Sequence, residues 1–388
     1  MIILDRETKS NISIAHANKV IRIFVCGPTV YDNCHVGHAR IFVLVDLISR
    51  VLQSRNYVAH VIVNITDIDP KLFENNINPD LIFGNLIYDL NKLGIDNLNY
   101  ARATDYVEES KYLIEKLMER KLAYSINGNV YLDSSKFKSY GALSHLSKKE
   151  LQNQRYDIDI NKRNITDIFL WNTSDNYGIQ YNDMNFGNGT PWWHTQDTAV
   201  AMFHFEGNYD IHVGGVDLCF PHHEMLRALL MALSGKKKPV KCWMHIGIVD
   251  LESTKMSKST GNAIYLRDLL EKFDSNTLKL YFYSLDYKKI MNFSVSELTR
   301  FEEINTMIRN IVSTSIENKD YDTRNDNVST DSMELRKDTN TNTLEQFYNY
   351  IENDLDTPNA LELFLQTVVN SNKLNEAREM MKIFGLEY

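Results

Sequence analysis

The sequence predicts an α/β fold, in which a parallel sheet carries helices on both faces and a short helical domain follows. Three observations support this fold. Hydrophobic segments of strand length recur along the chain, and segments with helical spacing of apolar residues separate them. In addition, 43% of the 388 residues are hydrophobic and 24% are charged, which is typical of a globular protein with two or three domains and a buried core.

The first strand, helix and strand form a βαβ unit. Residues 20–31 (VIRIFVCGPTVY) combine a buried strand with a Gly-Pro turn, and residues 58–66 (VAHVIVNIT) predict a second strand. Residues 37–54 predict the helix between them, because apolar side chains recur at helical spacing at Ile41, Leu44, Val45, Ile48, Val51 and Leu52. This order indicates two parallel strands joined by a crossover.

The middle of the chain contains an insertion before the alternation resumes. Residues 84–98 and 105–122 predict amphipathic helices. Residues 128–190 are polar, rich in Asn and Asp and mixed in pattern, as expected of an insertion. A strand, a helix and a strand then follow, at residues 209–213 (YDIHV), about 222–234 and 243–249 (WMHIGIV).

The last part of the chain is predicted to be helical beyond a polar linker. Residues 314–343 are poor in hydrophobic residues and dense in Asn, Asp, Thr and Ser, which is typical of a partly disordered surface linker. A helix is predicted to begin at Thr357-Pro358, a capping residue followed by proline in the first turn. We therefore divide the chain into the first half of the sheet domain (1–100), a connective insertion (101–190), the second half of the sheet domain (191–300), a connecting helix and linker (301–343) and a helical C-terminal domain (344–388).

Charge and composition restrict the location and partners of the protein. No run of 18 apolar residues predicts a membrane span, and the N-terminal residues lack the apolar region of a signal peptide. Four scattered cysteines do not form a disulfide framework, so we expect a reduced, cytoplasmic protein. The net charge of −9 lowers the expectation that a large polynucleotide is the partner, and DNA is not expected.

Two histidines mark the start of the first predicted helix. His35 and His38, in His35-Val36-Gly37-His38, lie three residues apart and so on one face of the first turn. Unpaired N–H groups and the positive end of the helix dipole favour an anion there, and Gly37 leaves room for a nucleotide against the backbone. The alternative is that one histidine caps the helix and the other lies on the surface.

A lysine-rich loop about 220 residues later favours a role for the histidines in binding phosphates. It reads Lys255-Met256-Ser257-Lys258-Ser259, followed by Thr260-Gly261-Asn262. An isolated lysine pair is usually only solvated, but two lysines on such a loop can neutralise charge on a departing pyrophosphate. Together and in this order, the two motifs resemble the signature motifs of class I aminoacyl-tRNA synthetases.

Further segments resemble cysteinyl-tRNA synthetases in particular, between about residues 20 and 265. They are Cys26-Gly27-Pro28-Thr29-Val30-Tyr31-Asp32, Asn64-Ile65-Thr66-Asp67-Ile68-Asp69, Trp193-His194, Gly214-Gly215-Val216-Asp217-Leu218 and Phe220-Pro221-His222-His223-Glu224. Weaker likeness surrounds Asp354-Leu355-Asp356-Thr357-Pro358. The resemblance implies the class I synthetase version of the Rossmann-like parallel sheet, and ATP-dependent activation of an amino acid, cysteine by default, as an aminoacyl-adenylate.

The resemblance also implies roles for individual residues. His35, His38, Lys255 and Lys258 would act on the phosphates of ATP, with Gly37, Ser257 and Ser259 beside them. Gly214, Gly215 and Asp217 would line the adenosine pocket, and Cys26, Gly27, Thr66, Trp193 and Asp197 would surround the amino acid. The chemistry agrees, because a substrate carboxylate is already a nucleophile at neutral pH. Alignment and screening of two anions then call for histidine, lysine and Mg²⁺ rather than a catalytic base.

The zinc site of the resembled family is altered in this sequence. Its four ligands would fall at Cys26, Asp197, His222 and Leu226, where the family has two cysteines, a histidine and a glutamate. In one interpretation Cys26, Asp197 and His222 hold Zn²⁺ through three ligands, and the substrate thiolate completes a tetrahedron. In the other, the metal is lost and Asp197 binds a different polar or cationic side chain. Cys219 could replace a ligand, but a small buried residue is its more ordinary role.

The acceptor of the activated amino acid has two candidates. The residues end at Tyr388, before the anticodon-binding region of cysteinyl-tRNA synthetases, and the missing zinc-site glutamate also resembles the mycothiol-pathway cysteine ligase. With the acidic net charge, this favours transfer to a small-molecule amine over transfer to tRNA. A shortened cysteine-tRNA ligase is the alternative. A third hypothesis is a non-catalytic binding protein that has kept the synthetase fold.

Overall fold

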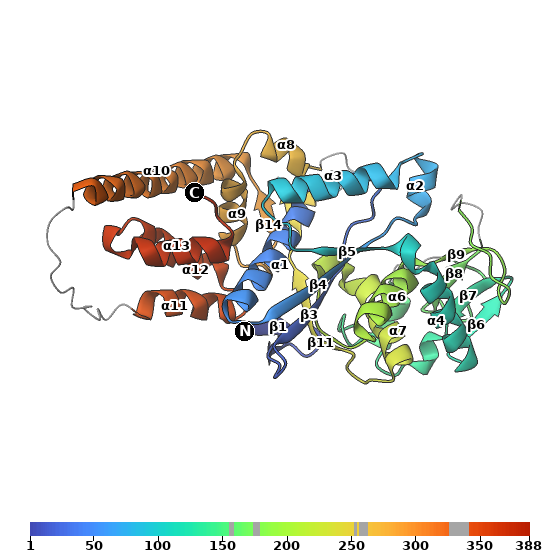
Figure 1. Cartoon of the computed structure of the whole chain (residues 1–388). Helices are drawn as coiled ribbons and strands as arrows, with labels where there is room; N and C mark the ends of the chain where they lie inside the picture. The colour runs from blue at the N-terminus through green and yellow to red at the C-terminus, as the bar shows by residue number, and fades with distance from the viewer. Residues whose placement is uncertain (155–158, 174–178, 252–253, 256–262, 326–340) are drawn as a thin grey trace.

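A five-stranded parallel sheet forms the centre of the protein. The computed structural model describes residues 1–154, 159–173, 179–251, 254–255, 263–325 and 341–388. Within them the strands are ordered β11-β10-β3-β4-β5, and every neighbouring pair is parallel. The strands are β3 (Val20–Val25), β4 (Val58–Ile65), β5 (Asn99–Arg102), β10 (Tyr209–Gly215) and β11 (Val240–Ile246). The predicted parallel α/β sheet is confirmed (Figure 1).

The strand order reverses at β3. From β3 the chain passes through α1 (Val36–Ser54) to β4, and through α2 (Pro70–Glu74) and α3 (Pro79–Lys92) to β5. The later strands β10 and β11 pair on the other side of β3. In open α/β sheets, ligands bind outside the carboxyl ends of the strands at such a reversal. The topology therefore directs a site to the carboxyl ends of β3 and β10.

Both faces of the sheet are buried, because successive side chains of a strand point to opposite faces. In β3, Ile21, Ile23 and Val25 join the large hydrophobic core that includes α1 and the C-terminal helices. Phe24 points to the other face, where it joins the core formed with α6 (Trp193–Phe205) and α7 (Glu224–Ser234). Helices thus cover both faces, as the sequence predicted.

The insertion between β5 and α6 forms a smaller unit beside the sheet. It contains α4 (Val107–Glu119), α5 (Lys148–Gln152) and an antiparallel sheet of β6 (Ala123–Ile126), β7 (Asn129–Leu132), β8 (Ile168–Asn172) and β9 (Thr190–Pro191). Its core includes Leu113 and Trp171 and extends to Met225 and Leu229 of α7. The insertion therefore packs on the helices that cover the second face of the central sheet (Figure 1).

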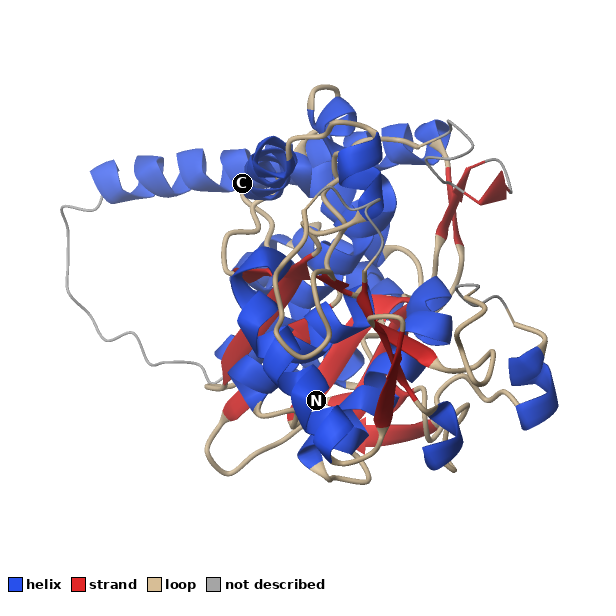
Figure 2. Ribbon diagram, turned by 90° about the vertical axis from the view of Figure 1, so that its right-hand side faces the viewer, coloured by secondary structure: helices blue, strands red, loops and turns tan. Residues whose placement is uncertain are grey.

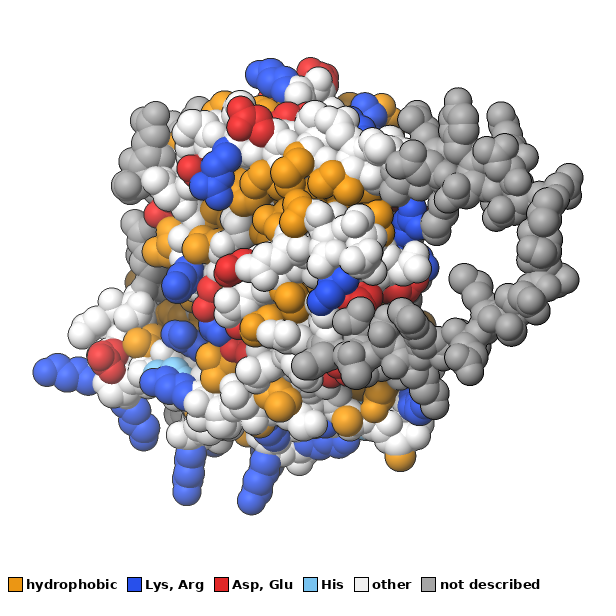
Figure 3. Space-filling view, turned by 90° about the vertical axis from the view of Figure 1, so that its left-hand side faces the viewer, with side chains coloured by type: hydrophobic (Ala, Val, Ile, Leu, Met, Phe, Trp, Pro, Cys, Tyr) orange, Lys and Arg blue, Asp and Glu red, His pale blue; other side chains and the backbone are white. Residues whose placement is uncertain are grey.

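Helices gather at the C-terminal end of the chain (Figures 1 and 2). They are α8 (Leu266–Leu270), α9 (Ser275–Tyr283), α10 (Val295–Asn325), α11 (Thr341–Glu352), α12 (Thr357–Val368) and α13 (Leu374–Phe384). A small sheet of β12 (Val249–Leu251), β13 (Thr254–Lys255) and β14 (Met291–Phe293) precedes α10, and a hairpin of β1 (Ile2–Asp5) and β2 (Ser10–Ser13) begins the chain. Figure 3 shows that the face of these helices combines hydrophobic side chains at its upper centre with lysines and arginines along its lower edge. Among the described residues, no helix has the length and apolar character to cross a membrane.

The predicted linker is shorter than expected. Helix α10 continues to Asn325 and α11 begins at Thr341, so both ends of the predicted segment 314–343 are helical, and residues 326–340 lie outside the described part. The prediction used low hydrophobicity and the density of Asn, Asp, Thr and Ser, although residues such as Glu317, Lys319 and Arg324 favour helices intrinsically. The helix predicted at Thr357-Pro358 is confirmed, but its N-cap is Asp356 rather than Thr357, because the Asp356 carboxylate accepts the N–H of Asn359.

Candidate active site

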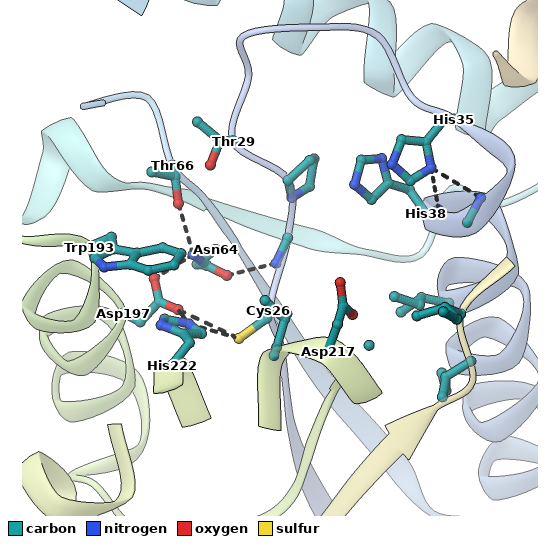
Figure 4. Close-up of a pocket in the computed structure, with 18 of the residues that line it drawn as sticks. Cys26, Thr29, His35, His38, Asn64, Thr66, Trp193, Asp197, Asp217 and His222 are labelled. Atoms are coloured by element: carbon teal, nitrogen blue, oxygen red, sulfur yellow. Dashed lines mark hydrogen bonds and ion pairs between the residues drawn. The ribbon is translucent and has the colours of Figure 1, made fainter. Parts of the chain in front are cut away.

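A cavity of about 330 Å³ opens at the carboxyl ends of β3, β4 and β10. Eleven predicted site residues line it: Cys26, Gly27, His35, Gly37, His38, Thr66, Trp193, Asp197, Gly215, Asp217 and His222. Figure 4 shows the histidine side of the cavity (His35 and His38) across from its cysteine side (Cys26, Asp197 and His222). Gly214 does not line the cavity, and the predicted residues Ser257, Lys258 and Ser259 lie outside the described part of the chain.

The histidine side is built on the start of α1, in a way that differs in part from the prediction. His35 is the N-cap rather than part of the first turn, and its Nδ1 accepts hydrogen bonds from the N–H groups of Gly37 and His38 at 3.1 and 3.3 Å. These two N–H groups therefore already have a partner, although they were predicted to bind an anion. The rings of His35 and His38 stack with their centroids 3.7 Å apart. Imidazole groups, rather than those backbone groups, are thus presented to the cavity.

The lysine loop is attached to the histidine side at one of its ends. Strand β13 ends at Lys255, the first residue of the loop, and the described chain resumes at Ala263. Directly after the loop, the carbonyl of Ile264 accepts a hydrogen bond from the N–H of Val36 at 2.9 Å, and Tyr265 pairs with His35. The backbone that follows the lysine motif therefore runs beside the histidine motif.

Arg40 holds α1 against the end of β11 and was not predicted. Its guanidinium is fully buried and donates to the carbonyls of Gly247 and Lys289 at 2.8 and 2.9 Å, and to that of Asp286 at 3.1 Å. Burial lowers the pKa of Arg40 to about 10. Gly247 lines the cavity, so Arg40 joins two of its walls. An arginine within an otherwise apolar helix face was the only signal for it in the sequence.

The cysteine side brings together three of the residues predicted around a metal. Cys26 Sγ lies 3.5 Å from both Asp197 Oδ2 and His222 Nε2, and these two atoms lie 2.8 Å apart. All three side chains are buried. Cys26 directly follows β3, Asp197 comes from α6 and His222 precedes α7, so the central sheet and both helices of its second face contribute.

Two of the three separations between these donors fit a zinc ion. Bonds of about 2.0–2.3 Å in a tetrahedral complex place neighbouring donors roughly 3.3–3.6 Å apart. Both distances from Cys26 Sγ meet this requirement, whereas His222 and Asp197 are at hydrogen-bond distance. Leu226 is fully buried among apolar side chains, so that position supplies no donor.

Asn64 orients the cysteine side and was not predicted as a site residue. At the end of β4, its Oδ1 accepts the N–H of Gly27 at 2.7 Å, while its Nδ2 donates to Asp197 Oδ1 at 2.6 Å. A Cβ atom on Gly27 would lie 1.9 Å from the backbone carbonyl oxygen of Asn64, so only glycine allows the two segments to approach this closely. Asn64 belongs to one of the segments that resemble cysteinyl-tRNA synthetases. Its role, however, follows only from its position between Gly27 and Asp197 in the structure.

Burial shifts the pKa values of Cys26 and of three histidines near the cysteine side. Burial, followed by the charge of Asp197, raises the pKa of the Cys26 thiol well above its ordinary value. Burial also lowers the pKa values of His194, His212 and His223 well below the usual range. Neutral imidazole is the form that binds metal ions. Cysteine binds metal ions as the thiolate, so a bound cation would have to offset the raised pKa of Cys26.

Comparisons with known proteins assign the family. Residues 12–303 match the family described as tRNA synthetases class I (C) catalytic domain. The cysteine--tRNA ligase of Methanococcus aeolicus is 31% identical over 95% of this chain and 78% of its own length, and that of Thermoplasma acidophilum is 36% identical over 76% and 68%. The fold is also that of Mycobacterium tuberculosis methionyl-tRNA synthetase, solved with methionyl-adenylate, with a TM-score of 0.68, 15% identity, and coverage of 94% of this chain and 87% of that one. The chain thus belongs to the cysteine branch of the class I tRNA synthetases, whose members are ATP-dependent ligases.

Proposed function

We propose that the cavity activates an amino acid, cysteine by default, as an aminoacyl-adenylate. One observation carries this proposal: a single cavity presents stacked histidines on one side and a Cys-Asp-His cluster on the other. The histidine side suits the phosphates of ATP, and the cysteine side suits an amino acid side chain. A substrate spanning both would place its carboxylate between them, next to the α-phosphate.

The reaction needs alignment and charge screening. The substrate carboxylate attacks the α-phosphorus of ATP, a new O–P bond forms, and pyrophosphate leaves with the electron pair of the broken bond. His35 and His38 would bind the phosphates, and Lys255 and Lys258 would neutralise the leaving pyrophosphate. Gly215 and Asp217 would contact the adenosine, a role that the sequence also predicts for Gly214. Ser257 and Ser259 of the lysine loop would lie beside the phosphates. Mg²⁺ would accompany ATP.

We further propose that the cysteine side holds Zn²⁺ through Cys26, Asp197 and His222. When bound there, zinc would supply a Lewis-acid position for the thiolate of the substrate. Trp193, whose ring stacks on His222 with centroids 4.9 Å apart, and Thr66 would enclose the amino acid. In the alternative, Asp197 binds a cationic side chain without metal, and either partner, the metal or the side chain, would have to share the Asp197 oxygens with Asn64 and His222.

Two acceptors for the activated amino acid follow from different observations. The net charge of −9 favours a small amine, which needs no polyanion-binding surface. The relatives are named cysteine--tRNA ligases, and this favours tRNA. Transfer to either acceptor would form a bond to the acyl carbon, an amide or an ester respectively, and release AMP.

Amino-acid-dependent exchange of pyrophosphate into ATP tests the activation step. Protein of measured zinc content is assayed with a panel of amino acids, and we expect exchange with cysteine. Exchange with none of them would favour the hypothesis of a non-catalytic binding protein. The acceptor is tested with radiolabelled cysteine: amide formation with small amines in the absence of RNA supports the first acceptor, and cysteine esterified to tRNA supports the second.

A further inference from the structure

The family's fourth zinc donor is lost at Leu226, yet another side chain from the same region reaches the cluster. His223 Nε2 lies 3.2 Å from Cys26 Sγ. One donor atom each from Cys26, His222 and His223 lie within 4.8 Å of one another. The separation from the sulfur is close to the edge of a tetrahedral zinc site, roughly 3.3–3.6 Å. A second imidazole is therefore placed where a metal held by Cys26 and His222 would be in reach.

The orientation of the His223 ring is fixed from behind. Its Nδ1 lies 2.8 Å from Nε2 of His245, and this pairing leaves Nε2 directed at Cys26. Such a partner on the second nitrogen is the usual way in which proteins orient a metal-binding histidine. Both rings are buried, and burial lowers the pKa of His245 to about 3.

Gly214 makes the space for this ring. A Cβ atom at position 214 would lie 2.6 Å from Cε1 and 3.0 Å from Nε2 of His223. Gly214 was predicted to line the adenosine pocket, but it is absent from the cavity wall and packs against the imidazole instead. Gly214, near the end of β10, thus makes room for the imidazole of His223.

We propose that His223 is a metal ligand of this chain beside Cys26 and His222, with which its donor atom forms one close group, in place of the glutamate lost at Leu226. The inference rests on the proposed zinc site. With one thiolate, one carboxylate and two imidazoles, the site with Zn²⁺ is neutral, whereas two thiolates, one carboxylate and one imidazole leave one negative charge. A neutral site attracts an incoming substrate thiolate more strongly.

His212 is the competing imidazole, since its Nε2 also lies 3.2 Å from Cys26 Sγ. Its Nδ1 lies 2.8 Å from the hydroxyl of Tyr209, at the buried base of β10. We assign His212 as a hydrogen-bond donor to the thiolate of Cys26. The experiment must therefore count the imidazole ligands of the metal and also show whether His223 or His212 supplies the second one.

X-ray absorption spectroscopy of the zinc-loaded full chain, before any amino acid is added, tests the assignment. Imidazole rings give a characteristic multiple-scattering signal, so sulfur and imidazole ligands can be counted. We expect one sulfur and two imidazoles for the unaltered protein. His223→Asn should lose one imidazole and bind zinc about 100-fold more weakly in competition with a chelator, whereas His212→Asn should keep two.

Several results would overturn the proposal, and the unaltered protein alone can do so if a variant does not fold. A single imidazole, or the absence of bound zinc, contradicts the assignment of His223. Two imidazoles that survive in His223→Asn but not in His212→Asn assign the ligand to His212 instead. Pyrophosphate exchange measured on the same preparation separates the two proposals, because exchange with a single-imidazole spectrum rejects the ligand and retains the function.

Discussion

A buried lysine joins the C-terminal helices to the sheet domain and provides a quantitative test of the structure. Lys279 of α9 is 1% exposed, and its Nζ donates to the carbonyl of Gly385 at the end of α13 at 2.5 Å. Helix α13 packs on α1, which carries His35 and His38 at its other end. We predict that Lys279→Met changes the pH dependence of stability.

The magnitude follows from the pKa of Lys279, which burial lowers from 10.5 to about 8. Between these values the unfolded chain binds more protons at this position than the folded chain, so the free energy of unfolding rises with pH. Below pH 8 the lysine is charged in both states and contributes no slope. From about pH 7.5 to about pH 9.5, the unaltered protein should gain about 2 kcal/mol relative to Lys279→Met.

Urea denaturation at both pH values measures this difference. Groups other than Lys279, including buried thiols, titrate equally in both proteins and cancel in the comparison. The hydrogen bond lost to Gly385 shifts the stability of the variant at every pH without changing the slope. Lys272→Met, at an exposed lysine between α8 and α9, is the matched control and should follow the unaltered protein. If the free energies of unfolding of Lys279→Met and the unaltered protein change equally with pH, the lowered pKa of a buried Lys279 is refuted.

Three further substitutions test the site and its supports. His38→Ala should reduce pyrophosphate exchange about 100-fold or more while leaving the urea midpoint almost unchanged, and normal exchange would reject its proposed role. Arg40→Met should lower the free energy of unfolding by about 2–4 kcal/mol in urea, because three carbonyls, of which that of Gly247 is buried, lose a donor from a fully buried guanidinium; a loss below about 1 kcal/mol would contradict this. Asn64→Ala should weaken zinc binding about 10–100-fold in chelator competition, since Asp197 loses its orienting amide, and an unchanged affinity would show that Asn64 does not act through Asp197.

Most of the central sheet could be predicted because its strands are buried on both faces. Strands β3, β4, β10 and β11 are hydrophobic runs, and the periodicity of α1 is equally clear. Strand β5 was missed because its four residues, Asn99–Arg102, carry little hydrophobicity at the edge of the sheet. Helix α3 was predicted about five residues late, although Asn78 caps it and Pro79 occupies its first turn. Capping residues were the better guide there.

The site residues were predicted from motifs, and parallel strands explain why the motifs meet. Cys26 and Asp217 lie far apart in the sequence, but each follows a strand whose carboxyl end reaches the same edge of the sheet. Arg40 and Asn64 were not predicted, because each acts through backbone groups or side chains that the sequence does not place beside it.

Spacing also failed where the chemistry of the chain departs from its family. Counting four residues beyond His222 reaches Leu226, whose burial among apolar side chains shows that a donor is lost there. The adjacent His223 was passed over, because the resemblance assigns a ligand only to the first histidine of the motif. Yet the chain that leads into α7 is not a regular α-helix: Phe220, two residues before His222, is extended, and a π-helical turn spans Cys219–His223. Two consecutive histidines can therefore both face Cys26, and only the backbone path, rather than the residue count, decides which side chains meet a metal.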